Sequence, residues 1–123
     1  MTAFLVLLVG PLAGALAAVA LPGRAARAVA AATTAATLVA AVVLAGQILT
    51  QGVLRLELGG WAPPLGIALE ADGLSAVLLV MTASVMTAVG LAARHELAPD
   101  MAGPRAAFGF WPLMLLLWAA LNA

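Results

Sequence analysis

The chain has 123 residues, of which 66% are hydrophobic and 8% are charged, and its mean hydropathy is +1.20. A soluble domain carries about 25% charged and about 45–50% apolar residues, so this composition excludes an ordinary soluble protein and indicates an integral membrane protein. The net charge is zero, which gives no basic patch for nucleic acid, and the absence of cysteine excludes disulfides and thiolate sites.

Three apolar runs are long enough to cross a bilayer, and we predict helices over residues 2–21, 25–49 and 75–94. At about 1.5 Å per residue, about 20 residues cross a hydrocarbon core that is roughly 30 Å thick. No basic segment precedes the first run, so we expect a retained helix and not a cleaved signal peptide.

The fourth apolar run, residues 106–123, is at the limit of what can span. It is long enough if it starts at Ala106. It is too short if Trp111 marks the membrane–water interface, where tryptophan is common. We therefore predict an all-α integral membrane fold, a single membrane segment over residues 1–123 with three to four transmembrane helices.

The segment between the second and third helices, residues 50–74, has a different pattern. Residues 53–58 alternate between apolar and polar side chains, and residues 65–70 do so more loosely. Two glycines and two prolines lie between them and favour a turn, so the segment is predicted to be an external β-hairpin. Trp61 suits an interfacial anchor. The candidate structural residues of the turn are Gly59, Gly60, Trp61, Pro63 and Pro64.

Asp72 and Ser75 follow the hairpin, at the start of the third helix. Either side chain can accept hydrogen bonds from the free amides of a helix N-terminus. The negative charges of Glu70 and Asp72 also suit the helix dipole. The alternative is that both carboxylates belong to an ion entry funnel. Because capping explains these residue types without any transport role, we interpret Asp72 and Ser75 as structural residues.

Polar side chains within the predicted spans are few. Gly10 and Gly14 form a GxxxG pattern, which favours close helix contact but is common by chance in an alanine-rich chain. Hydroxyl groups on the second and third helices can line a wet path, although they more often bond to their own helix backbone. Gln47 is interpreted as the one amide within reach of a span. His95 is the only histidine, which disfavours a histidine metal site.

The arginines are distributed unequally between the two sides of the predicted membrane. Four fall in two connections, residues 21–27 and 94–105, and only Arg55 falls in the hairpin segment. Arginine-rich loops stay cytoplasmic. We therefore predict a multi-pass protein of the inner (plasma) membrane, with these two loops inside and with the N-terminus and hairpin outside. The four arginines are Arg24, Arg27, Arg94 and Arg105.

The stretch "LGGWAPPLGIALEADGLSAVLLVMTASV" (58–85), placed after two helices, resembles the antiporter-like membrane subunits. These include the D-type subunits of Mrp-type cation/proton antiporters, the N, M and L-type subunits of respiratory complex I, and related membrane-bound hydrogenase subunits. The Mrp D-type is the most similar. "RAAFGFWPLMLLLWAALNA" (105–123) resembles the start of the fourth helix in that family, so the resemblance extends over nearly the whole chain.

The resemblance concerns only the N-terminal portion of such subunits, which have many more helices. It implies an ion path that uses a glutamate on the fifth helix and lysines on later helices. This chain has no lysine and no glutamate within a predicted span, so none of these residues has a counterpart. We therefore assign no catalytic, cofactor-binding or metal-binding residue and predict no cofactor. The chain is not expected to be catalytic alone, and the parent complex can be a redox-driven pump.

We interpret the chain as an N-terminal or split structural part of an antiporter-like subunit in a proton- or cation-translocating membrane complex. The expected partners are the lipid bilayer, other membrane subunits and a larger polytopic chain that carries the remaining helices, but no nucleic acid. The alternative is a free-standing small membrane protein, either holin-like or an assembly factor. A neighbouring reading frame that begins with a fifth helix and a buried glutamate would favour the first interpretation.

Overall fold

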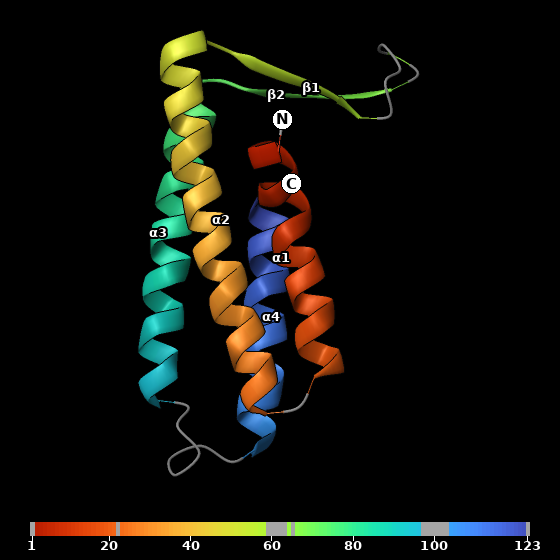
Figure 1. Ribbon diagram of the computed structural model, residues 1–123, viewed down its shortest axis with the longest axis vertical. Helices are drawn as coiled ribbons and strands as arrows, with labels where there is room; N and C mark the ends of the chain where they lie inside the picture. The colour runs from red at the N-terminus through yellow and green to blue at the C-terminus, as the bar shows by residue number, and fades with distance from the viewer. Residues whose placement is uncertain (1, 22, 59–63, 65, 97–103, 123) are drawn as a thin grey trace.

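The computed structural model describes residues 2–21, 23–58, 64, 66–96 and 104–122. Within them, four helices accompany a two-stranded antiparallel hairpin (Figure 1). The elements are α1 (Thr2–Ala20), α2 (Arg24–Gln51), β1 (Leu54–Leu58), β2 (Ile67–Ala71), α3 (Gly73–Glu96) and α4 (Pro104–Asn122). α1, α2 and α3 are long and apolar enough to cross a membrane, and the apolar part of α4 is shorter. The predicted fold class, a helical membrane segment with a hairpin between the second and third helices, is confirmed.

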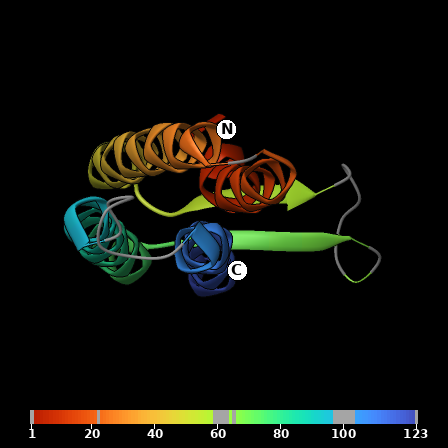
Figure 2. The same ribbon diagram turned by 90° about the horizontal axis from the view of Figure 1, so that it is seen from below.

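The helices form a bundle in which α1 and α2 make one row and α3 and α4 make the other (Figure 2). α1 packs against both α2 and α4, and α2 also packs against α3, whereas α3 and α4 touch each other only slightly. The start of α1, the end of α4 and the hairpin all lie at one end of the bundle (Figure 1). The hairpin therefore covers the end at which the first and last helices meet.

The contact between α1 and α2 depends on small residues. A Cβ atom placed on Gly14 would lie 2.5 Å from Thr33 Oγ1 and 2.7 Å from Thr33 Cγ2, so a side chain at this position would clash with α2. One turn earlier, a Cβ atom on Gly10 would lie 3.7 Å from Thr37 Oγ1, which is an ordinary contact. The GxxxG pattern thus faces α2, and Gly14 is the position that requires glycine.

Most hydroxyl groups on α2 and α3, although not those of Thr33 and Thr82, bond to their own helices. Thr34 and Thr37 on α2, and Ser84 and Thr87 on α3, each donate to the carbonyl four residues earlier, at 2.7–2.8 Å. Such bonds occupy the hydroxyl hydrogen, which would otherwise be available to a water molecule or a neighbouring helix. The structure therefore favours the backbone-bonding interpretation of these residues over a wet path.

Large aromatic side chains of α4 fill the interior of the bundle. Trp111 is 3% exposed and Trp118 is fully buried. The ring of Phe110 meets that of Trp111 edge to face, with 5.2 Å between the centroids. Trp111, the residue that would mark the interface if the fourth helix were too short to span, thus packs inside the bundle. The physical reason is that the alanine-rich helices leave space that only large side chains can fill to normal packing density.

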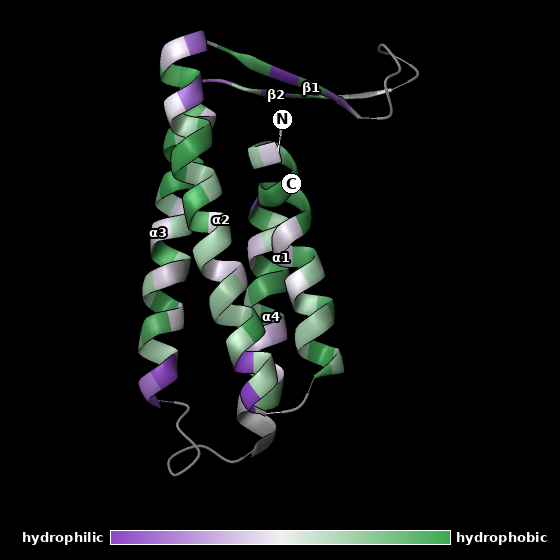
Figure 3. Ribbon diagram, viewed as in Figure 1, coloured by the Kyte–Doolittle hydropathy of each residue, from purple (hydrophilic) through white to green (hydrophobic). Residues whose placement is uncertain are grey.

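Hydrophilic residues gather at the two ends of the bundle (Figure 3). Arg24 and Arg27 lie in the first turn of α2, and Arg94 and His95 lie in the last turn of α3, at the end opposite the hairpin. Arg55 lies in β1 at the hairpin end. The apolar stretches between these two ends contain no ionisable side chain.

Replacing Gly14 with alanine is expected to destabilise the bundle, because the new methyl group would meet Thr33. Gly46 on α2 is the matched control, since a Cβ atom there meets nothing within 4 Å and alanine gains up to about 1 kcal/mol of helix propensity over glycine. Unfolding of the purified chain by SDS in mild detergent should show a lower free energy for Gly14→Ala and an equal or higher one for Gly46→Ala.

Adding Thr33→Ala to Gly14→Ala removes the two closest atoms, so it should restore part of the lost stability. Wild-type stability of Gly14→Ala alone would contradict the close approach of α1 and α2.

Candidate functional site

The polar end of the bundle is built around the hairpin. β1 and β2 pair antiparallel, with Arg55 opposite Glu70 and Leu56 opposite Leu69. Arg55 Nη2 lies 3.1 Å from Glu70 Oε2, and the two side chains are 72% and 49% exposed. Such an exposed pair adds little stability but favours this register. Leu56 and Ala71 are buried on the other face of the ribbon, which faces the helices.

The carboxylate of Asp72 binds the first turn of α3. Asp72 Oδ1 accepts hydrogen bonds from the backbone N–H and from the Oγ–H of Ser75, both at 2.8 Å. These bonds, the backbone one first, hold the pKa of Asp72 below its ordinary value even though the group is exposed. Asp72 is thus the acceptor and Ser75 a donor. The carboxylate of Glu70 forms an ion pair with Arg55 and does not cap the N-terminus of α3.

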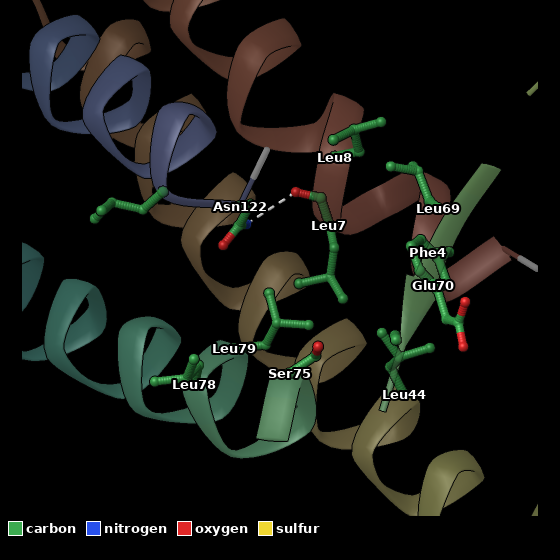
Figure 4. Close-up of a pocket in the computed structure, with 12 residues that line it drawn as sticks. Phe4, Leu7, Leu8, Leu44, Leu69, Glu70, Ser75, Leu78, Leu79 and Asn122 are labelled. Atoms are coloured by element: carbon green, nitrogen blue, oxygen red, sulfur yellow. Dashed lines mark hydrogen bonds between the residues drawn. The ribbon is translucent and has the colours of Figure 1, made fainter. Parts of the chain in front are cut away.

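A pocket of about 250 Å³ lies beneath the hairpin, where all four helices and β2 contribute to its wall (Figure 4). The wall is mostly leucine. Its polar residues are Glu70, Ser75 and Asn122, and the side chain of Glu70 lies on the outer face of the ribbon beside Arg55. Arg55 engages the carboxylate of Glu70, and the hydroxyl hydrogen of Ser75 is donated to Asp72. Within the residues that the structure describes, no group of three histidine, cysteine or acidic side chains gathers to hold a metal ion.

Asn122, at the end of α4, ties this helix to α1. Its Nδ2 donates to the backbone carbonyl of Leu7 at 2.9 Å (Figure 4). In a regular helix this carbonyl accepts a bond from the N–H of residue 11, but residue 11 is proline, which has no N–H. Asn122 therefore supplies the donor that Pro11 lacks. Because an unpaired carbonyl in hydrocarbon costs several kcal/mol, this bond favours docking of α4 on α1.

The interpretation of Gln47 as the one amide within reach of a span is therefore wrong. Asn122 lies within α4 and makes a bond to another helix. The sequence contains the signal for it: Pro11 inside an apolar helix implies a free carbonyl at Leu7, and an asparagine on another apolar helix is a natural donor. The pairing itself requires knowledge of which helices are neighbours.

The predicted turn residues are only partly described. Gly59, Gly60, Trp61 and Pro63 lie outside the described residues, so their turn geometry and the anchor role of Trp61 stay predictions. Pro64 lies in a turn and is exposed.

Comparison with known proteins gives one partial likeness to a membrane antiporter. Over 44 residues the chain is 43% identical to the D-type subunit of the Na(+)/H(+) antiporter of Bacillus subtilis (strain 168). The matched stretch is 36% of this chain and 9% of that relative's length. No protein-family model matches the chain. With its three membrane-length helices, the chain is consistent with a multi-pass membrane protein similar to a short part of an antiporter protein.

A double-mutant cycle tests whether Asn122 replaces the backbone donor that Pro11 lacks. Asn122→Leu removes the donor to Leu7 and is expected to lower the free energy of unfolding by about 0.5–1.5 kcal/mol. Pro11→Ala returns an N–H to α1, which can then bond to the Leu7 carbonyl. In the Pro11→Ala background, Asn122→Leu should therefore cost clearly less. SDS unfolding of the four chains of the cycle measures this difference. An equal cost in both backgrounds would contradict the repair.

Substitutions of Asp72 separate capping from a role for its charge. Asp72→Asn should be mild because asparagine caps about as well as aspartate, whereas Asp72→Ala should lower stability. Since the folded-state pKa lies below the ordinary value of 3.8, the stabilisation is present above the unfolded-state pKa. It is lost as pH falls through the folded-state pKa. Unfolding curves across acid pH should show this loss in the wild type and not in Asp72→Asn.

If Asp72→Asn lowers the free energy of unfolding at neutral pH as much as Asp72→Ala does, the capping interpretation of Asp72 is wrong.

Proposed function

We propose that this chain is an N-terminal, or split N-terminal, structural part of an antiporter-like subunit in a proton- or cation-translocating membrane complex. The observation that carries the proposal is the 43% identity over 44 residues to the D-type subunit of a Na(+)/H(+) antiporter, in a chain with three membrane-length apolar helices. An Mrp-type antiporter is the parent complex that we favour. Complex I-like and hydrogenase-like complexes are related parents that the same sequence resemblance allows.

The distribution of polar groups supports a bracing role and not an ion path. A proton or cation path through hydrocarbon needs ionisable groups or water-lined polar residues along its depth. The described apolar stretches have no ionisable side chain, and the hydroxyls of Thr34, Thr37 and Thr87 bond to their own helices. The residues that move the ion would then lie on helices outside this chain, and α1 to α3 would support them.

The hairpin supports a second structural task. It extends past α1 on one side of the bundle (Figure 1). A two-stranded ribbon is marginal in water by itself, so a ribbon that extends from a bundle is suited to pack against other protein. We propose that it contacts a neighbouring subunit on the outer face of the membrane.

Affinity purification of the tagged chain from its native membrane in mild detergent tests this function. We expect a larger polytopic protein that carries buried glutamate and lysine residues to co-purify and to be identified by mass spectrometry. A tagged membrane protein of similar size and unrelated sequence is the control. Recovery of the chain alone, as a homo-oligomer that permeabilises membranes, would contradict the proposal and favour a holin-like protein.

Labelling of single cysteines tests the proposed orientation, and the chain has no cysteine of its own to interfere. Ala68 on β2 and Ala25 beside Arg24 are both exposed, so a cysteine at either position can react. In intact cells, an impermeant maleimide should label Ala68→Cys. It should label Ala25→Cys only after permeabilisation, because the arginine-rich end is cytoplasmic. The reverse pattern would contradict this orientation.

A further inference from the structure

Two buried polar atoms of α4 have no hydrogen-bond partner among the described residues. They are the indole Nε1 of Trp118 and the amide Oδ1 of Asn122. Trp118 is 0% exposed, so its N–H cannot reach bulk solvent. The two residues are four positions apart, which places them one turn apart on the same face of the helix. Because an unpaired polar atom is costly inside a membrane bundle, this arrangement calls for a partner.

The chemistry of the two atoms defines that partner. The indole Nε1–H of Trp118 can only donate. The amide of Asn122 is oriented by Leu7, since its Nδ2 donates to the Leu7 carbonyl and a flipped amide would set two acceptors against each other. Its Oδ1 therefore points away from Leu7 and can only accept (Figure 4). A partner must accept one hydrogen bond and donate another, and water does both.

The neighbouring pocket provides a source for such a molecule. Asn122 forms part of the wall of the pocket of about 250 Å³ beneath the hairpin, together with Ser75 and Glu70. Pockets with polar groups in their walls hold water, whereas purely apolar ones stay dry. Trp118 is not among the residues that line the pocket, and Trp118 Nε1 and Asn122 Oδ1 are both covered by surrounding side chains. A small side-chain rotation therefore has to admit the molecule, which then exchanges slowly.

We propose that one internal water molecule, drawn from this pocket, bridges Trp118 Nε1 and Asn122 Oδ1 at the contact between α1 and α4. The water accepts the indole hydrogen of Trp118 and donates to Asn122. The water thereby extends the polar network that Pro11 begins. Only contacts within this chain are involved, so the proposal does not depend on the proposed function.

Nuclear magnetic resonance of the full chain tests the water site. The sample is deuterated, carries ¹⁵N-labelled tryptophan and is held in deuterated detergent micelles. Three tryptophans give three indole signals, and Trp118→Phe identifies the one from Trp118. We expect a cross-peak between the Trp118 indole hydrogen and water in a rotating-frame experiment, with the sign of dipolar contact and not of chemical exchange.

The matched comparison is Pro11→Ala against the double variant Pro11→Ala/Asn122→Leu. Both chains can satisfy the Leu7 carbonyl within α1, and only the second lacks Oδ1. An unchanged Trp111 indole signal verifies that the bundle is intact. The cross-peak should persist in the first chain and disappear in the second. A cross-peak in both chains, or none in the wild type, would overturn the proposal. A strongly shifted indole signal without a water contact would also overturn it, in favour of a direct bond from Trp118 to Asn122.

Discussion

The repair of one broken backbone hydrogen bond is the interaction on which the α1–α4 contact depends. Pro11 removes the donor for the Leu7 carbonyl, and inside a bilayer no bulk water can replace it. Asn122 supplies the donor from α4 at 2.9 Å, so the first and last helices of the chain become neighbours for a polar reason as well as for packing. Where α1 packs against α2, Gly14 lets α2 come so close that Thr33 occupies the space of a side chain.

The need to pair polar groups inside a bilayer also applies to the other polar side chains of the helices. The hydroxyls of Thr34 and Thr37 donate hydrogen bonds to carbonyls of their own helix, and the amide of Asn122 donates one to a carbonyl of α1. Charged residues are confined to the two ends, with arginines at one end and the hairpin with its Arg55–Glu70 pair at the other. A segment of this kind is suited to hold other helices in place, because it offers an ion no succession of groups to bind on the way across.

The order of elements along the chain is largely predictable from sequence, because hydrophobic length and alternation act locally. Helices are expected over residues 2–21, 25–49 and 75–94, the corresponding helices are Thr2–Ala20, Arg24–Gln51 and Gly73–Glu96, and the hairpin lies between the last two. The features that sequence does not predict concern pairs of helices. The sequence does not predict the burial of Trp111 and Trp118, which depends on how the helices are arranged. Pro11 signals a free carbonyl at Leu7, but the sequence does not show that its donor is Asn122, 115 positions away.

In the function that we propose, these helices brace a transport bundle without forming a pathway of their own. The most direct measurement is proton flux into liposomes that contain the purified chain and a trapped pH-sensitive dye, driven by a pH or sodium gradient. We predict flux equal to that of empty liposomes, because the apolar stretches of the helices hold no side chain that can change charge as an ion passes. Flux clearly above empty liposomes would contradict it.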